Sequence, residues 1–176
     1  MLVSVTQALN VLKQVYPVSE DVLEAAQTRG TIVHKACASY AKNLWVTVPE
    51  EYQGYFNSFR NWFEQYVQDV FLVEELLEDK KLGFCGHPDL ILILKGDKRP
   101  SLWDLKTPTS HLRIWKLQLA GYKRLALERF KNLDRIGSIR LDPNGGKPKL
   151  NEYLTYEEDI GVFLSLLNVY RFLEGK

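Results

Sequence analysis

The segment Gly83-Phe-Cys-Gly-His-Pro-Asp-Leu-Ile-Leu-Ile-Leu94 begins with turn-forming residues and continues as an apolar run that ends before Lys95. Apolar runs of this length between turn signals are typical of buried strands, so we predict a strand near residues 84–94. A turn at residues 98–100 leads into Ser101-Leu-Trp-Asp-Leu-Lys-Thr107, which predicts a partner strand near residues 100–106. The segment therefore predicts a hairpin of two strands.

Two aspartates would meet across this hairpin. Asp89 lies at the start of the first strand, and strand alternation places Asp104 and Lys106 on one face of the second. Two carboxylates about 4 Å apart repel by roughly 4 kcal/mol at an effective dielectric constant of about 20. A cation must offset this repulsion. Lys106 is one candidate, and a divalent ion that prefers oxygen ligands, Mg²⁺ or Mn²⁺, is the other.

A helix is predicted after the second strand. Residues 112–130 have helical periodicity, and Ser110 is available as an N-cap. Gln118 and Tyr122 are separated by four residues, with Trp115 one turn earlier, so all three would line one stripe of this helix. Such a stripe often belongs to the core, but its place directly after an Asp-x-Lys strand favours a functional site.

These motifs resemble those of the PD-(D/E)xK nuclease superfamily, in the branch that includes the RecB nuclease domain, Cas4 proteins and phage recombination exonucleases. Pro88-Asp89 and Asp104-Leu-Lys106 match the motif that names the superfamily, and Gln118-Leu-Ala-Gly-Tyr122 resembles the branch's Q-x-x-x-Y helix. Gly30-Thr-Ile-Val-His34 resembles an early helix whose histidine approaches the metal. The motifs occur in the family's order between residues 30 and 122.

The resemblance implies a role for each matched residue. Asp89 and Asp104 would be metal ligands, assisted by the backbone carbonyl of Leu105, and His34 would be an additional ligand or would contact metal-bound water. Lys106 would orient or activate the attacking water. Gln118 and Tyr122, which complete the catalytic set, would hold a DNA phosphate or the position of Lys106.

The resemblance also implies an acidic residue one strand earlier than Asp89. Residues 71–78 offer Glu74, Glu75 and Glu78. Strand alternation puts Glu74 and Glu75 on opposite faces, so only one of these two can reach the metal. We favour Glu75 as the ligand, with the other two glutamates as alternatives.

An iron–sulfur cluster is not expected, although some relatives in this branch carry one on four cysteines. The chain has two cysteines, Cys37 and Cys85, and no C-x-x-C pair. Two cysteines that form no evident pair favour a reducing compartment, which we take to be the cytoplasm.

The basic residues are unevenly distributed. The net charge is only +1, but residues 95–131 carry ten basic side chains against three acidic ones, a local balance of +7, whereas residues 50–81 have a balance of −5. A basic segment around a carboxylate site is the pattern expected for gripping the DNA backbone, although a solvated helix face would look the same. The candidate DNA-binding residues are Arg113, Lys116, Lys123 and Arg124.

The length of 176 residues and the apolar content of 45% predict a single domain over residues 1–176. No apolar stretch is long enough to predict a membrane span or a signal peptide, so no membrane association is expected. The aromatic stripe at residues 52–66 could serve the core or an interface, and a homo-oligomer or a recombination partner protein is therefore also considered.

The remaining elements complete a mixed fold. Helices are predicted at residues 3–16, 20–27 with Ser19 as cap, from 30–31 onward, 52–67 and 155–173 with Thr155 as cap. A strand is predicted near residues 70–78, and Asn144-Gly-Gly146 predicts a hairpin between residues 135–141 and 149–153. The expected fold class is mixed α/β: a restriction-endonuclease-like core with helices on both sides of a central mixed β-sheet.

The function that these expectations favour is a stand-alone Mg²⁺- or Mn²⁺-dependent DNase, an exonuclease of DNA recombination or repair. A structure-selective endonuclease and a DNA-binding subunit that needs a partner for cleavage are the alternatives. Nothing in the sequence resembles a base-reading module, which argues against sequence-specific cleavage.

Overall fold

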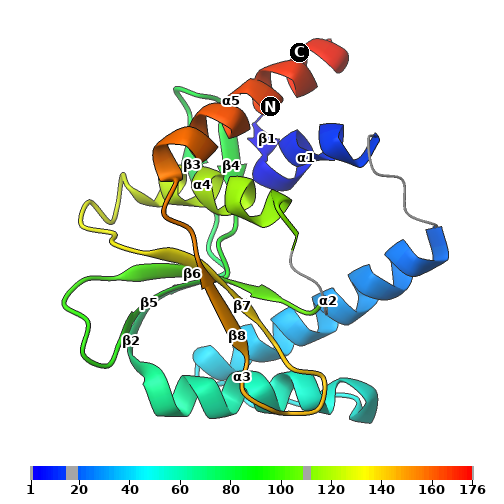
Figure 1. Ribbon diagram of the computed structural model, residues 1–176, viewed down its shortest axis with the longest axis vertical. Helices are drawn as coiled ribbons and strands as arrows, with labels where there is room; N and C mark the ends of the chain where they lie inside the picture. The colour runs from blue at the N-terminus through cyan, green and yellow to red at the C-terminus, as the bar shows by residue number, and fades with distance from the viewer. Residues whose placement is uncertain (1, 15–19, 109–111, 176) are drawn as a thin grey trace.

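The computed structural model describes residues 2–14, 20–108 and 112–175. Its centre is a five-stranded mixed sheet with the strand order β2-β5-β6-β7-β8 (Figure 1). The strands are β2 (Val67–Val73), β5 (Leu90–Leu94), β6 (Ser101–Lys106), β7 (Ile136–Arg140) and β8 (Lys149–Glu152). β6 and β7 pair in parallel, and the other three pairs are antiparallel.

The predicted hairpin forms the middle of this sheet. β5 and β6 are antiparallel with Leu90 opposite Trp103, so the register brings Asp89, one residue before β5, next to Asp104. The second predicted hairpin is also confirmed, since β7 and β8 pair antiparallel around a turn in which the Gly145 N–H donates to the Asp142 carbonyl. Gly145 has a φ of 81°, a backbone conformation that favours glycine.

Helices cover both faces of the central sheet, as the sequence predicted. α2 (Glu20–Ala41) and α3 (Gln53–Tyr66) lie on one side, and α1 (Val5–Leu9), α4 (Ile114–Ala126) and α5 (Tyr156–Leu173) lie on the other (Figure 1). Strand alternation provides core side chains on both faces of the sheet. Leu102 packs with α1, α4 and α5, whereas its neighbour Trp103 packs with α2 and α3. The fold class is therefore confirmed as mixed α/β with helices on both sides.

The structure adds a small second sheet that the sequence did not predict. Its order is β1-β4-β3, with β1 (Val3–Ser4), β4 (Phe84–Gly86) and β3 (Leu77–Asp79). The strands predicted at residues 70–78 and 84–94 are each divided between the two sheets. Glu74 interrupts the first with a φ of 52°, and Pro88, which has no N–H, lies in the break between β4 and β5.

The N-terminal half departs from the prediction in its helix boundaries. α2 is one helix of 22 residues rather than two helices that meet at Gly30, so this glycine lies inside a helix. The helix predicted at residues 3–16 is shorter: Ser4 caps α1 through its side chain, and a 3₁₀ turn (Asn10–Gln14) follows. The predicted cap Ser19 lies outside the described residues, as does Ser110.

At the other end of the chain, α5 spans Tyr156–Leu173 as predicted. Thr155 occupies its N-cap position, but its hydroxyl donates to the Asp159 carboxylate at 2.8 Å instead of accepting from the helix backbone. A 3₁₀ turn (Glu50–Tyr52) leads into α3. Among the helices of the described residues, none combines the length and the apolar character needed to span a membrane.

Candidate functional site

Asp89 lies where the β5–β6 ladder ends. The ladder pairs Leu90 with Trp103, so the Leu105 N–H, two residues further along β6, has no β5 carbonyl opposite it. The Asp89 carboxylate takes that place, because its Oδ2 accepts a hydrogen bond from the Leu105 N–H at 2.6 Å. Asp89 is 6% exposed, and this bond fixes the direction of its buried carboxylate.

His34 approaches the other oxygen of Asp89 from α2. Its Nδ1 lies 3.3 Å from Asp89 Oδ1. Burial by itself would lower the pKa of His34, but the charge of Asp89, the hydrogen bond with it and the charge of Asp104 together raise this pKa to about 9. His34 lowers the pKa of Asp89 in return, against the effect of burial, with help from Lys106 and the Leu105 N–H.

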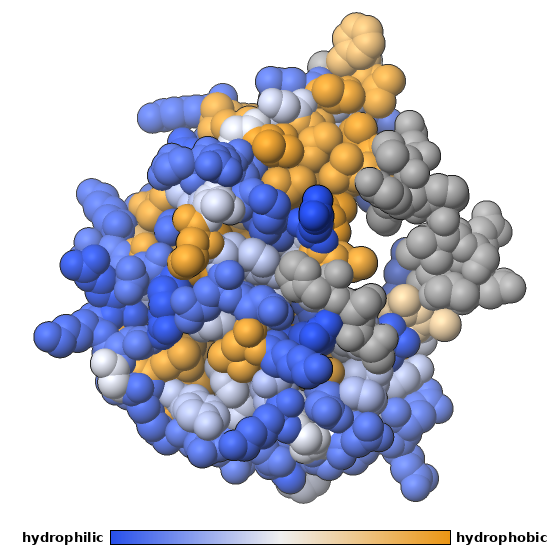
Figure 2. Space-filling model, in the orientation of Figure 1, coloured by the Kyte–Doolittle hydropathy of each residue, from blue (hydrophilic) through white to orange (hydrophobic). Residues whose placement is uncertain are grey.

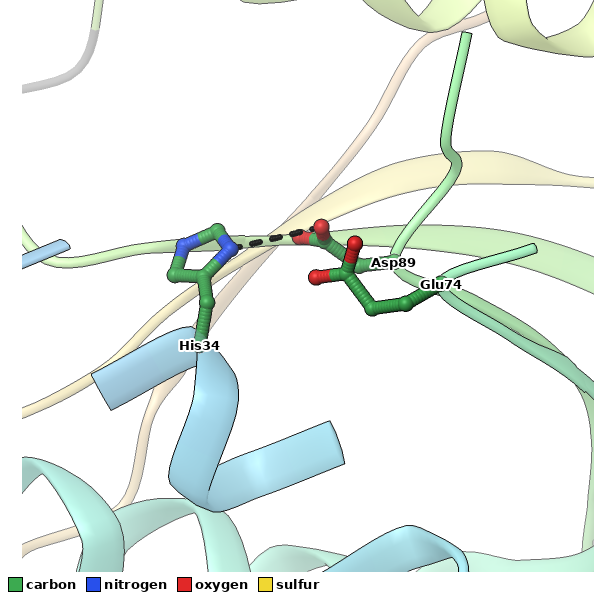
Figure 3. Close-up of side chains that lie close together, drawn as sticks. All are labelled: His34, Glu74 and Asp89. Carbon is green, nitrogen blue, oxygen red and sulfur yellow. Dashed lines mark hydrogen bonds and ion pairs between the residues drawn. The ribbon is translucent and has the colours of Figure 1, made fainter. Parts of the chain in front are cut away.

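Glu74 is the third group at this point. One ligand atom from each of His34, Glu74 and Asp89 lies within 4.8 Å of the others, and Figure 3 shows the two carboxylates turned toward one another beside the imidazole ring. The φ of 52° at Glu74 turns the chain out of β2 here, and the Glu74 N–H donates to the carbonyls of Pro88 and Asp89. Burial, followed by repulsion from Asp89, raises the pKa of Glu74 to about 7.

Asp104 and Lys106 form the second part of the site. They leave β6 on the same face, as strand alternation predicted, and their side chains form an ion pair in which Asp104 is 1% exposed. Burial raises the pKa of Asp104 to about 6 although Lys106 opposes the shift, and the charge of Asp89 contributes to it. The two aspartates therefore repel each other, as expected for carboxylates that share a small volume.

A chain of hydrogen bonds holds Lys106 from α4. Lys106 Nζ donates to Gln118 Oε1 at 2.9 Å, and Gln118 Nε2 donates to the Tyr122 hydroxyl at 3.2 Å. The ammonium group also lies 5.7 Å from the centroid of the Trp115 ring. Two members of the stripe predicted on this helix, Gln118 and Trp115, thus contact Lys106, and Tyr122 is linked to it through Gln118. Burial and the charges of Asp104 and Asp89 raise the pKa of Tyr122, so this residue is a neutral hydrogen-bonding group.

His34, the three carboxylates, Gln118 and Tyr122 line one cleft of about 820 Å³. One of its walls is α2 from Gln27 to Ser39, continued by Lys42 just after the helix, and the opposite wall includes Gln118 and Tyr122 of α4, with the acidic residues between them. Figure 2 shows a hollow at this place between the upper helices and α2. The cleft brings together residues of the predicted site that come from distant parts of the chain: His34, Asp89, Asp104, Gln118 and Tyr122.

The structure does not bring Glu75 to this cluster. Glu75 Oε2 accepts from Arg129 at 2.6 Å, and both side chains are about half exposed. Glu78 lies 3.8 Å from Lys80 on the surface. Of the three glutamates that the sequence left open, Glu74 is therefore the one whose carboxylate lies with His34 and Asp89.

The candidate DNA-binding cations on and near α4 have other contacts. Lys116 pairs with the buried Asp159 at 2.5 Å, and Arg124 pairs with the buried Asp79 at 3.0 Å. Lys123 Nζ lies 4.7 Å from the Tyr156 ring centroid and donates to the Asp134 carbonyl. Arg113 is exposed at the N-cap of α4. Most of these basic side chains thus contact residues of neighbouring elements. A count of charges along the sequence does not reveal such contacts.

Two cations that line the cleft come instead from α2 and from the turn just after it. Lys35 and Lys42 are both exposed and belong to the cleft wall that carries His34. The signal that could have found them is helical spacing. Lys35 and Lys42 are seven positions apart, so they would lie on nearly the same face of one helix.

The arrangement can hold a divalent cation. It combines two carboxylates and an imidazole within a few ångströms, beside a third, buried carboxylate. Carboxylates suit Mg²⁺ and Mn²⁺, and an imidazole is also a common metal ligand. The mutual repulsion of these carboxylates is the electrostatic condition that a bound cation relieves.

Comparison with one solved structure supports the fold assignment. A protein from Eubacterium rectale, described as a "putative exonuclease", matches with a TM-score of 0.63 over 99% of this chain and 82% of its own, at 9% sequence identity. The protein SSO0001 matches with a TM-score of 0.47 over 97% of this chain and 75% of its own, at 15% identity. No family model matches the sequence, and no curated protein matches it significantly.

Proposed function

We propose that this protein is a divalent-metal-dependent deoxyribonuclease of the PD-(D/E)xK type, and that it acts as an exonuclease in DNA recombination or repair. The observation that carries the proposal is the placement of Asp89 and Asp104 in one cleft, with Lys106 paired to Asp104. The fold that this chain shares with the protein from E. rectale, described as a "putative exonuclease", supports the same reading.

The residues that would hold the metal are Asp89, Asp104, His34 and Glu74. Glu74 would take the role of acidic ligand for which the sequence favoured Glu75. A bound divalent cation would neutralise charge on the phosphodiester and make water a stronger nucleophile at neutral pH. The sequence also favoured the carbonyl of Leu105 as a ligand. Its N–H fixes Asp89, so we propose that Leu105 positions the first carboxylate whether or not its carbonyl binds metal.

Lys106 would act directly on the substrate. Asp104 and Gln118 hold its ammonium group from two sides, so the side chain loses little further entropy when substrate binds. A fixed cation at this point stabilises the negative charge that grows on the phosphate oxygens, and its N–H groups can orient the attacking water. Tyr122 would act through Gln118 and would therefore be a positioning residue.

The experiment that tests this proposal compares end-labelled linear duplex DNA with covalently closed circular DNA. Each is incubated with Mg²⁺, Mn²⁺ or EDTA, and wild type is compared with Lys106→Ala. Metal-dependent loss of the linear substrate alone, abolished by the substitution, is the expected result. Cuts in the circular DNA would indicate an endonuclease. Cleavage of neither substrate with either metal would contradict a stand-alone nuclease.

A further inference from the structure

Trp45 is exposed although the other tryptophans of this chain are buried. The chain has four tryptophans, and Trp62, Trp103 and Trp115 are at most 4% exposed, whereas Trp45 is 93% exposed. A tryptophan side chain carries a large apolar area, so leaving it in water forgoes stabilisation that the three buried ones supply. A side chain of this kind on the surface is a candidate for contact with a ligand.

The segment that carries Trp45 is fixed at one end of the cleft. Leu44, the preceding residue, lines the cleft, and its N–H donates to the Ser39 carbonyl at 2.9 Å. Val46, the following residue, packs against the core between α2, α3 and the sheet. Trp45 thus lies between Leu44, which lines the cleft, and Val46, which packs against the core. Its Cα is about 3.8 Å from that of Leu44.

The same end of the cleft carries positive charge. Lys42 lies just after the end of α2, two residues before Leu44, and Lys35 lies two turns earlier beside His34. Lys42 is eight positions after His34, which corresponds to about 12 Å along the helix direction at 1.5 Å per residue. A stacked strand advances about 3.4 Å per nucleotide, so roughly three nucleotides would reach from the acidic residues to this end.

We propose that Trp45 stacks on an unpaired base of the substrate strand while Lys42 and Lys35 contact its phosphates, so that the cleft takes single-stranded DNA or an unpaired end. This inference rests on the proposed nuclease function and gives it a substrate class. The face of a base is open to an aromatic side chain only where the base is unstacked from its neighbours. Stacking on a tryptophan is tolerant of sequence because every base has such a face.

The experiment measures binding of short fluorescein-labelled strands by fluorescence anisotropy with Mn²⁺ present. All variants are made in the Lys106→Ala background so that the strands stay intact. One strand is an oligothymidylate, and the other is an abasic strand of the same length, which keeps the phosphates and lacks the bases. Trp45→Ala is compared with Trp45→Phe and with Leu154→Ala, which removes another exposed apolar side chain, 89% exposed, from the connection before α5.

The expected result is about tenfold weaker binding of the oligothymidylate by Trp45→Ala, with most of the affinity kept by Trp45→Phe and all of it by Leu154→Ala. The parent should prefer the oligothymidylate to the abasic strand, and Trp45→Ala should lose that preference. Lys35→Ala should weaken binding of both strands equally, because it removes a phosphate contact.

A Trp45→Ala variant that binds the oligothymidylate as the parent does, or that keeps the preference for bases, would overturn the inference. In that case the proposed nuclease function would still stand if the protein with Lys106 intact degrades linear DNA. Failure of the parent to bind either strand would overturn the inference, and failure of the wild type to degrade DNA would separately count against the nuclease itself.

Discussion

The Asp89 carboxylate accepts a hydrogen bond from the Leu105 N–H at 2.6 Å, although the two residues are 16 positions apart in the chain. The bond stands where the next backbone bond of the β5–β6 ladder would be, so the sheet itself sets the orientation of this carboxylate. His34 binds the other oxygen from α2. The central sheet and a helix packed beside it thus fix one acidic side chain from two directions, which is the precision that a metal ligand requires.

Asp104→Asn should abolish metal-dependent cleavage without unfolding the protein. Burial raises the pKa of Asp104 to about 6, so at pH 7 the folded state holds an ionised carboxylate that burial disfavours. Its removal should leave the free energy of unfolding unchanged or raise it by up to about 3 kcal/mol. Urea denaturation of the metal-free protein measures this. A loss of several kcal/mol would show that the ion pair with Lys106 outweighs the cost of burial.

Lys106→Ala should keep metal affinity and lower turnover by about 100-fold or more, because a held cation is removed from the reacting phosphate. Tyr122→Phe should have a milder effect, since Tyr122 reaches Lys106 only through Gln118. Metal titration combined with single-turnover cleavage separates the two properties. Full activity in Lys106→Ala would remove Lys106 from the catalytic group.

Glu74→Gln and Glu75→Gln form a matched pair that tests the acidic ligand. Glu74→Gln should weaken Mn²⁺ binding by about tenfold or more, because it removes a charge next to His34 and Asp89. Glu75→Gln should leave the affinity nearly unchanged, since Glu75 pairs with Arg129 on the surface. Isothermal titration calorimetry measures both constants. The opposite order would restore Glu75 as the ligand.

Metal binding should release protons, and the affinity should rise with pH. The pKa values of Glu74 and His34 are raised to about 7 and about 9, so both groups carry protons over part of the interval from pH 6 to pH 9 in the metal-free protein. A ligand must lose its proton to bind metal, so affinity should increase from about pH 6 to pH 9. Calorimetry in buffers of different ionisation enthalpy counts the protons. Binding without proton release at pH 7 would contradict this assignment of ligands.

Arg124→Ala and Lys35→Ala should separate structural from substrate-binding cations. Arg124 pairs with Asp79, which is 1% exposed, so its removal leaves a buried carboxylate without its cation and should cost roughly 2–4 kcal/mol of stability. Lys35 is exposed in the cleft, and its removal should weaken DNA binding at little cost in stability. Thermal denaturation and DNA titration of both variants give the comparison. A stable Arg124→Ala variant that binds DNA weakly would favour the role that the sequence suggested.

Local patterns were sufficient to predict the part of the fold around β5, β6 and α4. Apolar runs and turn signals located the hairpin, and strand alternation placed Asp104 and Lys106 on one face. The spacing of Gln118 and Tyr122 likewise predicted a shared helix stripe. These features depend on residues close in sequence, for which periodicity is informative.

The features that the sequence missed depend on tertiary structure. Strand alternation could not choose between Glu74 and Glu75, because the choice is made by the positive φ at Glu74, where the chain leaves one sheet for the other. The count of basic residues could not show that Lys116 and Arg124 face buried aspartates. Each outcome is decided by partners distant in the chain.

The most direct test of the metal-dependent site is a crystal structure of the protein grown with Mn²⁺, with anomalous diffraction recorded near the manganese edge. A peak in the anomalous difference map at about 2.2 Å from a carboxylate oxygen of Asp89, with Asp104, His34 or Glu74 also in contact, is the predicted result. An ordered Asp89–Asp104 pair without any anomalous peak beside it, at a Mn²⁺ concentration that supports cleavage, would contradict the account.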